Sequence, residues 1–248
     1  MILDNFQDII KHTSGLGFIE MVKLTGEATD ATIEAMDEDR TVVVYGKLKN
    51  PVDGLDGVVG LSRLGILSGY LGFTPFGTDN ATVDIRTQQR NGTDIPCEIA
   101  FDSHNGHTAA YRFMSAEIAE EQIKVPPFKG ATWDVVITPA QSALRDLNAM
   151  NGVLGAFESV FTVSTVDSNL VFSIGEGASD RSKITFAKDI SGSLKHAWSW
   201  PLPRVLSILK LQESSANCTM SFSDQGALKI SIGSGLGEYE YILPARSK

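Results

Sequence analysis

The sequence of 248 residues contains only two cysteines, Cys97 and Cys218, and they do not stand at metal-binding spacing. This excludes a disulfide framework and indicates a reducing compartment. No apolar run approaches the ~18 residues that a membrane-spanning helix needs. The first eight residues include two acidic side chains and no basic one, a pattern that argues against a signal peptide. We therefore expect a cytoplasmic protein.

Catalytic motifs are also scarce. Of four histidines, the closest pair, His104 and His107, flanks an Asn-Gly dipeptide. Asn-Gly favours a two-residue hairpin turn because both residues tolerate positive φ, so we interpret this stretch as a hairpin tip rather than a metal site. The sequence has neither a G-x-x-x-x-G-K-[ST] phosphate loop nor a G-x-S-x-G nucleophile elbow. It therefore predicts no enzyme, no catalytic residue, no metal and no cofactor.

Basic residues are outnumbered, with 21 Lys and Arg against 30 Asp and Glu and a net charge of −9. Nucleic-acid-binding proteins usually carry a basic footprint, so the overall charge taken alone argues against that class. The net charge of a chain does not, however, determine the charge of one surface. Hydrophobic residues make up 42% of the chain, enough for a sizeable core.

Most of the chain has the pattern of short strands. Alternating or β-branched runs separated by turn residues recur along it, for example at residues 41–45, 82–85, 160–164 and 183–186. Only four segments have a helical pattern of apolar residues. They span about residues 4–14, 58–71, 139–150 and 202–211. The sequence thus predicts an α+β protein dominated by strands.

The order of these segments suggests a structural duplication. A helix, a block of strands, a second helix and more strands are followed by the same succession again. Between the halves, acidic residues precede Val125, Pro126 and Pro127, and two adjacent prolines favour an extended connector. We predict an N-terminal domain at residues 1–116, a connector at 117–131 and a C-terminal domain at 132–248. Each domain is expected to have antiparallel sheets with two helices on one face.

The charges are unevenly distributed between helices and strands. The four helical spans contain five basic and three acidic residues, so they are mildly basic on an acidic chain. Polar stripes such as Asn5, Asp8 and His12 lie opposite the apolar positions. One interpretation is that these are ordinary solvated faces. The other is a shared helical surface that faces phosphates without reading sequence.

Three short segments resemble a known family. Residues 35–44, with the run Met36-Asp37-Glu38-Asp39-Arg40, resemble the strand-turn-strand of eukaryotic and archaeal sliding clamps. Residues 64–68 are similar to the second helix of clamps from large tailed phages. Residues 237–246 resemble the final strand and tail of the same fold. The element order, the duplication and the proline-bearing connector agree with this resemblance.

The resemblance implies a DNA polymerase processivity factor with the DNA-clamp fold. Three two-domain subunits join head to tail into a ring, the helices line the hole, and duplex DNA passes through it without being read. The implied partners are duplex DNA, a replicative DNA polymerase, a clamp loader and two further copies of the chain, and no membrane. The phage-like second helix suggests a phage protein in a bacterial host cytoplasm.

The resemblance also implies roles for particular residues. DNA-facing candidates are the five basic residues of the helical spans, namely Lys11, Arg63, Arg145, Arg204 and Lys210. A groove for a partner peptide corresponds to Met36, Arg40, Ile123, Val125, Ile242, Leu243, Pro244 and Ala245. Arg40 departs from the smaller residue that is common in cellular clamps. Subunits are expected to join through Ala109, Tyr111 and Phe113 of one copy and Ile184 and Phe186 of the next.

Two other functional classes remain open at this point. A β-rich structural or assembly protein of a virus also oligomerises and also lacks catalytic motifs, although it has no need of basic helical stripes. An enzyme with an unrecognised site is the third class, and a strongly shifted titrating pair in a cleft would indicate it.

Overall fold

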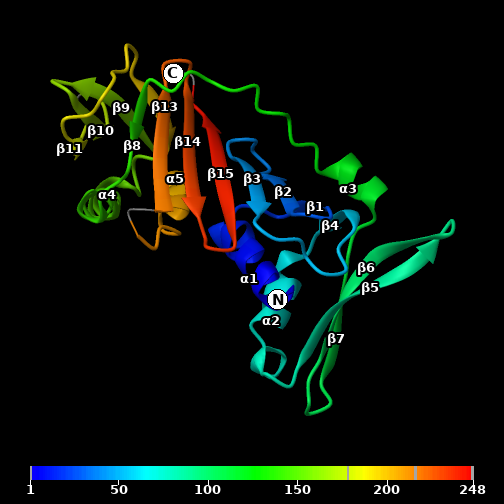
Figure 1. Cartoon of the computed structure of the whole chain (residues 1–248). Coiled ribbons are helices and arrows are strands. Elements are labelled where there is room, and N and C mark those ends of the chain that lie inside the picture. Colours follow the sequence, from blue (N-terminus) through cyan, green and yellow to red (C-terminus); the bar gives the residue numbers. More distant parts are fainter. Residues whose placement is uncertain (1, 178, 215–216, 247–248) are drawn as a thin grey trace. The chain divides into compact units, whose positions relative to one another are not determined.

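The computed structural model describes residues 2–177, 179–214 and 217–246 (Figure 1). The chain divides into two compact units. Unit 1 comprises Met1–Pro126 with Ser234–Tyr239, and unit 2 comprises Pro127–Gly233 with Glu240–Lys248. In the described part of the chain, no helix is both long and apolar enough to cross a membrane.

Unit 1 is built from two sheets and a pair of helices. The first sheet has the strand order β4-β1-β2-β3 within this unit, and the second has the order β5-β6-β7. All neighbouring strands run antiparallel. The elements are α1 (Ile2–His12), β1 (Val22–Gly26), β2 (Ala31–Met36), β3 (Val43–Leu48), β4 (Gly57–Leu61), α2 (Leu64–Leu71), β5 (Thr82–Arg90), β6 (Thr93–Asp102), β7 (Thr108–Arg112) and α3 (Ala116–Gln122), with short 3-10 turns at Ser14–Leu16 and Thr74–Gly77.

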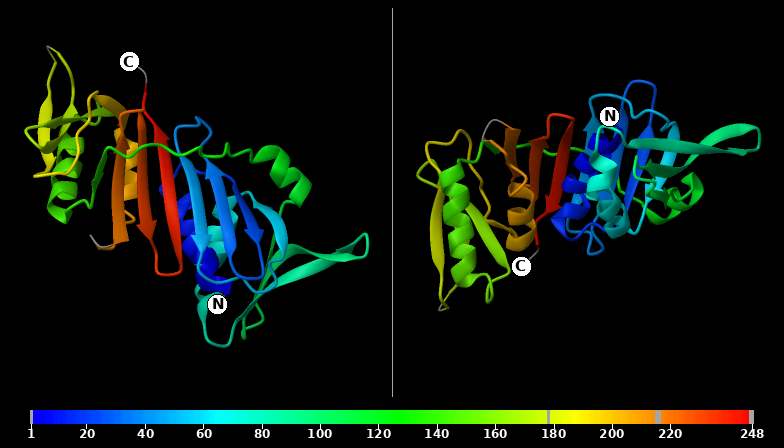
Figure 2. Two further views of the ribbon diagram at one scale, coloured as in Figure 1. Left: turned by 45° about the horizontal axis from the view of Figure 1, so that its top comes forward. Right: turned by 90° about the horizontal axis from the view of Figure 1, so that it is seen from below.

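Alternation along the strands determines which face of the first sheet is buried. Val22 and Leu24 of β1 and Ile33 of β2 are buried, whereas Lys23 and Glu34 lie on the opposite face and form an ion pair. Alternate side chains of a strand point to opposite faces, so one face becomes core and the other meets solvent. The helices α1 and α2 lie side by side (Figure 2).

The second sheet of unit 1 carries a projecting hairpin. β5 and β6 continue beyond the end of β7, and we call residues 87–96 the arm (Figure 1). The register between the two strands shifts at Arg86 and Thr87. The arm ends in a two-residue turn, where Asn91 and Gly92 have φ of 53° and 83°. These values suit the tight hairpin turn that Asn-Gly favours.

Unit 2 repeats this plan. Its four-stranded sheet has the order β11-β10-β9-β12, and a second sheet contains β14, β13 and β8. The elements are β8 (Val135–Ile137), α4 (Gln141–Leu154), β9 (Val160–Val166), β10 (Asn169–Ile174), β11 (Ser182–Ala187), β12 (Trp198–Pro201), α5 (Leu202–Leu209), β13 (Cys218–Ser223), β14 (Ala227–Gly233) and β15 (Gly237–Pro244), whose last five residues belong to this unit.

The core of unit 2 is aromatic. Phe161 of β9 and Phe172 of β10 meet at 4.8 Å between ring centroids, and Phe172 stacks on Phe186 of β11 at 4.1 Å. Trp200 of β12 packs against Phe222 of β13 at 5.8 Å. All five rings are buried. This cluster joins the inner faces of the two sheets of the unit, and such aromatic pairs contribute beyond their buried area.

The structure confirms the predicted duplication of element order. In unit 1 the first sheet reads β4-β1-β2-β3, and in unit 2 the corresponding strands read β12-β9-β10-β11, which is the same order. In each unit the helix that follows the fourth strand, α2 or α5, leads into three further strands. Strand β8 pairs with β13 and precedes this repeated succession. The fold is α+β with antiparallel sheets, as predicted.

Several predicted local features are wrong. The second helix was expected over residues 58–71, but Gly57–Leu61 is strand β4 and the helix begins at Leu64. This strand pairs with β1, and its residues Val59 and Leu61 are buried. The connector was expected to be extended, but its first part is helix α3. The hairpin tip at residues 103–107 has a three-residue loop with Gly106 at φ 79°, since Ser103 pairs with His107.

Helix α3 packs closely on β4 because Gly60 of that strand has no side chain. A Cβ atom at Gly60 would lie 2.9 Å from the Ala119 Cβ and 3.0 Å from the Met114 Cβ. Contacts this short are not seen between real Cβ atoms, so the helix could not stay in place. The backbone of Gly60 also exchanges both hydrogen bonds with Met114. Glycine at this position therefore allows α3 to pack on the sheet.

We expect Gly60→Ala to lower the free energy of unfolding by about 1–3 kcal/mol, because overpacking displaces α3. Gly65→Ala is the matched control. Gly65 lies in helix α2 with open space around its Cα, so alanine should raise stability by about 0.5–1 kcal/mol through helix propensity. Urea unfolding measures both variants. Equal stability of the two would contradict the proposed contact.

Candidate functional site

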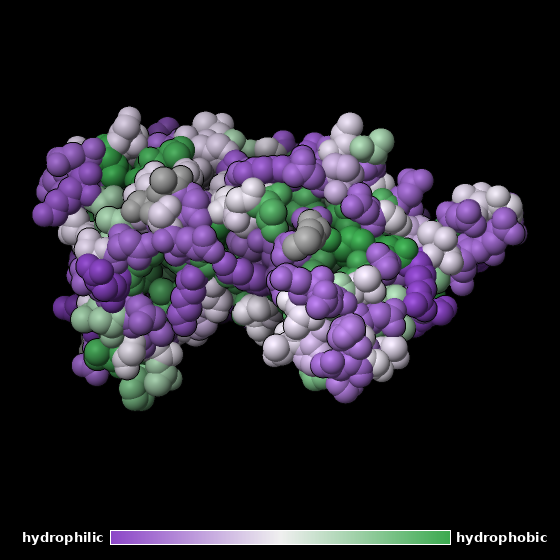
Figure 3. Space-filling view, turned by 60° about the horizontal axis from the view of Figure 1, so that its bottom comes forward, coloured by the Kyte–Doolittle hydropathy of each residue, from purple (hydrophilic) through white to green (hydrophobic). Residues whose placement is uncertain are grey.

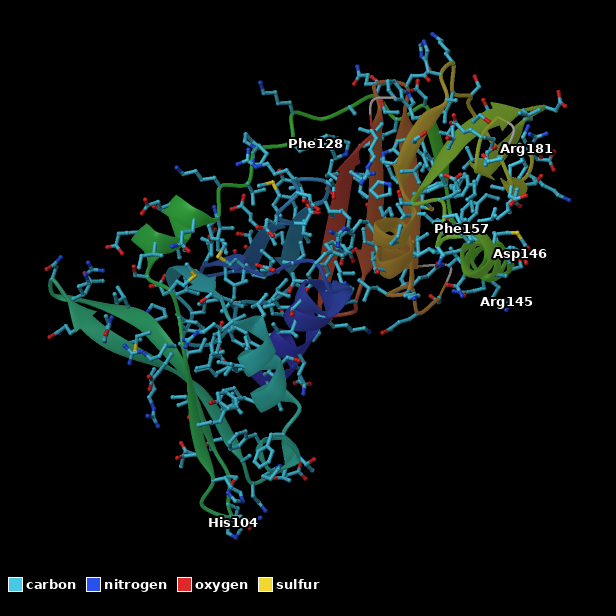
Figure 4. The ribbon with its side chains drawn as sticks, turned by 180° about the vertical axis from the view of Figure 1, so that it is seen from behind. His104, Phe128, Arg145, Asp146, Phe157 and Arg181 are labelled. Atoms are coloured by element: carbon cyan, nitrogen blue, oxygen red, sulfur yellow. The ribbon has the colours of Figure 1, made fainter. Side chains whose placement is uncertain are left out.

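Two of the basic residues predicted to face DNA lie on one groove of unit 2. A cleft of about 230 Å³ between α4 and α5 is lined by Arg145 from α4 and by Lys210 at the end of α5. Both side chains are exposed. Figure 4 shows Arg145 and Asp146 on the outer side of α4. The rest of the lining consists of Gln141, Leu144, Asn148, Leu206, Leu209 and Gln212.

A buried glutamine holds the two helices of this groove together. The Gln212 side chain is 9% exposed, and its Nε2 donates to the Pro139 carbonyl at 3.2 Å. Its Oε1 is the one buried side-chain acceptor without a partner among the described residues. Gln212 thus ties the segment after α5 to the segment before α4. Sequence reasoning missed it, because a lone polar residue after a helix gives no signal of burial.

The other three predicted DNA-facing residues are divided between the units. Lys11 is exposed in the last turn of α1, and Arg63 is exposed immediately before α2. The amide of Gln7 donates to the Leu71 carbonyl at 3.0 Å and links α1 to α2. Arg63 has a φ of 52°, a left-handed conformation that few arginines adopt. In unit 2, Arg204 on α5 is half-buried.

The polar stripe predicted on the first helix is not a solvated face. Asp8 and His12 are buried, with His12 only 1% exposed. The Asp8 carboxylate accepts hydrogen bonds from the hydroxyls of Ser234 and Tyr239, both at 2.8 Å, and the His12 ring stacks on Tyr239 at 4.1 Å. The stripe is buried because the segment Ser234–Tyr239 belongs to unit 1 and covers this side of α1.

The turn after β2 is rigid and acidic. The Asp37 carboxylate accepts hydrogen bonds from the Thr41 amide at 2.7 Å, the Thr41 hydroxyl at 2.6 Å and the Val42 amide at 2.8 Å. Arg40 in this turn is exposed, with a φ of 56°. The hydrogen bonds of Asp37 hold the backbone of the turn in place. They therefore also fix the position of the Arg40 backbone within it. Met36 precedes the turn and is half-buried opposite Val43.

The end of the connector in unit 1 lies against the outer face of the first sheet. The Tyr45 hydroxyl on β3 donates to the carbonyl of Pro126. Of the predicted partner-binding residues in this stretch, Ile123 is buried and Val125 is half-buried. The hydroxyl of Tyr45 is a feature that sequence reasoning missed. A tyrosine on the solvent side of an alternating strand is its only signal.

The part of the connector in unit 2 is held by an aromatic stack. Phe128, labelled in Figure 4, stacks on Trp133 with 6.0 Å between the ring centroids. The Lys229 ammonium lies 5.4 Å from the centroid of the Trp133 ring. Lys229 also pairs with Glu240 at 2.8 Å. Of the predicted residues in the tail, Ile242 and Leu243 are buried, Pro244 is exposed and Ala245 is half-buried.

The strands predicted to join subunits each end a sheet. β7 is an end strand in unit 1, and β11 is an end strand in unit 2. Tyr111 is buried and donates its hydroxyl to the Ser62 carbonyl, and burial raises the pKa of Tyr111 to about 12. Phe186 is buried too, while Ala109, Phe113 and Ile184 are half-buried.

Exposed apolar residues accompany both end strands. Helix α2, which contacts β7, presents Ile66 at 44% exposure, and α4, which contacts β11, presents Val153 at 63%. Phe157, just after α4, is 85% exposed (Figure 4). Exposed apolar side chains beside an unpaired strand edge are typical of a surface that another chain covers.

The residues that the structure describes contain no cluster of three or more His, Cys, Asp or Glu that could hold a metal. Cys97 and Cys218 are both free, and burial raises the pKa of the Cys218 thiol to about 12. A thiol held protonated in this way is a poor nucleophile.

Comparison with solved structures identifies the fold. The proliferating cellular nuclear antigen (PCNA) of Entamoeba histolytica matches with a TM-score of 0.69 and 12% identity, over 99% of this chain and 96% of that chain. The fold is that of the PCNA sliding clamps. PCNA of Thermococcus kodakaraensis matches with a TM-score of 0.69 and 14% identity, over 98% and 97% of the two chains. The sliding-clamp fold was thus correctly predicted.

Two further clamps were solved as complexes. PCNA of A. fulgidus, bound to the C-terminal region of FEN-1, has a TM-score of 0.70 and 9% identity over 100% of this chain and 97% of that chain. The PCNA2-PCNA3 complex of Sulfolobus tokodaii has a TM-score of 0.67 and 14% identity over 100% and 98%. No protein-family model and no curated protein sequence matches the chain.

We expect two anchors to hold the connector, one in each unit. Tyr45→Phe removes only the hydroxyl that binds Pro126, and Trp133→Leu removes the stack with Phe128. In Tyr45→Phe, trypsin should cleave several-fold faster after the exposed Lys124. In Trp133→Leu, it should cleave several-fold faster after the exposed Lys129.

Cleavage after Lys195, on an exposed loop of unit 2, provides the internal control and should keep its rate. Two variants that are cut at the wild-type rate at both connector sites would show that these contacts do not order the connector.

Proposed function

We propose that the protein is a sliding clamp that encircles duplex DNA as a homotrimer and tethers a DNA polymerase. The observation that carries the proposal is the pairing of this fold with exposed basic residues on its helices. In unit 2, Arg145 and Lys210 flank one groove between α4 and α5. In unit 1, Lys11 lies on α1 and Arg63 immediately precedes α2. Such contacts to phosphates are independent of sequence.

The charge distribution supports contact with DNA through the helices. The whole chain has a net charge of −9, so a surface that binds DNA must be locally basic. The turn with Glu38 and Asp39, which follows β2 and is not part of a helix, is acidic and exposed. A few basic residues per subunit bind weakly, which suits a ring that slides, because three copies multiply the contacts.

A head-to-tail ring would use the end strands. β7 of one subunit would pair with β11 of the next, and this removes both open edges. The exposed Ile66 and Val153 beside these strands would be buried in the same joint. Because the two surfaces differ, the contact is heterologous. Such contacts form a ring when the rotation between neighbouring subunits closes the circle.

The connector and the tail are proposed to bind short peptides of partner proteins, among them the polymerase and a clamp loader. The half-buried Met36, Val43 and Val125 offer apolar contacts in unit 1, and Pro244 and Ala245 do so in unit 2. The A. fulgidus clamp binds the C-terminal region of FEN-1, which supports peptide binding by proteins of this fold. Such a groove selects a peptide by its apolar anchors.

We expect the double variant Arg145→Glu with Lys210→Glu to lose DNA-dependent stimulation of polymerase processivity, because it reverses two charges at one groove. Retention on nicked circular DNA measures the effect directly. The control is Lys195→Glu, which makes the same charge change on an exposed loop away from the helices. Normal retention of the double variant, or equal loss in the control, would contradict a DNA-facing groove.

We expect the wild-type chain to form a particle of three 26.7 kDa subunits in light scattering. Ala110→Glu on the exposed part of β7 should give monomers, since a carboxylate would be buried in the joint. Tyr111 is unsuitable for this test because it is buried and its change would disturb the fold.

Thr82→Glu places the same charge on β5, at the other edge of the same sheet, and should leave the assembly intact. A strict monomer of the wild-type chain at high concentration would refute the ring. It would favour the structural-protein alternative.

A further inference from the structure

Unit 1 contains a second cleft, whose lining includes neither residues of the helical groove nor those of the connector anchors. Its volume is about 360 Å³, within the range of small-ligand sites. Four segments meet there, namely the start of β4, the arm, the end of β7 and the start of α3. All lining residues belong to unit 1.

The cleft exists because strand pairing stops early on one side of the arm. The Phe113 amide donates to the Cys97 carbonyl, and then Met114 leaves β6 and exchanges both backbone hydrogen bonds with Gly60 of β4. On that side, the arm portion of β6 has no paired strand among the described residues. The register shift at Arg86 and Thr87 falls at the base of the arm, and such irregularities bend a hairpin. The open space lies between the arm and α3.

The cleft is lined by apolar side chains and by two guanidinium groups. The apolar residues include Ile95 and Pro96 of the arm, with Val58, Phe113 and Met114. Pro96 also has no N–H to leave unpaired on this strand. Arg90 and Arg112 supply the positive charges, in a sheet region whose outer surface is hydrophilic (Figure 3, right-hand projection). An apolar lining with a few polar groups is the usual composition of a ligand site.

Both arginines are held in place and still have unused donors. One Arg90 nitrogen contacts the two Glu117 oxygens at 3.0 and 3.2 Å, and one Arg112 nitrogen contacts Glu98 at 3.1 Å. A guanidinium has five N–H donors in a planar fork. The Arg90–Glu117 pair is exposed, and exposed ion pairs contribute little stability, so an incoming anion can replace Glu117.

We propose that this cleft binds an amphipathic monoanion, with its apolar body against the apolar lining residues and a single carboxylate or sulfonate bound at the arginines Arg90 and Arg112. Asp56 and Glu117 also line the cleft and would repel a second negative charge. The same chemistry is offered by a free organic acid and by the carboxyl end of an apolar peptide. Binding would also separate the arm from α3, since Arg90 exchanges Glu117 for the ligand.

Fluorescence titration with 8-anilinonaphthalene-1-sulfonate tests the site on the full chain. We expect saturable binding with one site per chain, weakened roughly tenfold by Arg112→Gln and by Arg90→Gln, because each removes a charge-assisted hydrogen bond. The matched control is Arg86→Gln. Arg86 lies on β5, the strand that also carries Arg90. It forms ion pairs with Glu98 and Asp102, but it does not line the cleft.

Binding that is equally strong in all four proteins, or equally weakened in Arg86→Gln, would overturn the proposal. Displacement of the probe by octanoate identifies a free organic acid as the preferred source. Displacement by a peptide ending in Leu-Phe, but not by its C-terminal amide, identifies a peptide carboxylate. Displacement by neither would overturn the ligand class. Circular dichroism confirms that each variant is folded, and the outcome is independent of DNA binding.

Discussion

Each unit depends on the burial of the apolar face of its alternating strands. In unit 2 this burial brings Phe161, Phe172 and Trp200 together in one aromatic core, and the corresponding strands of unit 1 bury Val22, Leu24 and Ile33. Burial of such large side chains is the main favourable term in folding. The same alternation leaves polar residues on the outer face. Helices that cover the sheets therefore bury one side and are free to expose basic residues on the other.

The buried polar side chains form specific contacts within each unit. The buried polar groups stabilise architecture. Asp8 joins α1 to Ser234 and Tyr239, Asp37 satisfies its own turn, and Gln212 joins the segment after α5 to the segment before α4. Buried polar groups need partners, and these contacts provide them for the two carboxylates and for Nε2 of Gln212, although not for its Oε1.

The proposed function and the proposed cleft use different surfaces. The proposed sliding would depend on weak, repeated contacts through the helices. The fold itself is shared with clamps at 9–14% identity. The cleft depends on an irregularity, the point where β7 leaves β6 and the arm continues alone. Local departures from a regular sheet commonly re-aim side chains, and here one places Arg90 beside α3.

The sequence by itself determined the strand-rich class and the duplicated order of elements, because apolar periodicity is written in consecutive residues. It could not distinguish β4 from the start of a helix, since a short buried apolar run fits both. Only the tertiary structure decided that Asp8 and His12 are buried, that α3 packs against Gly60 and that Arg90 forms an ion pair with Glu117. Each of these depends on residues far apart in the chain, whose proximity no local pattern records.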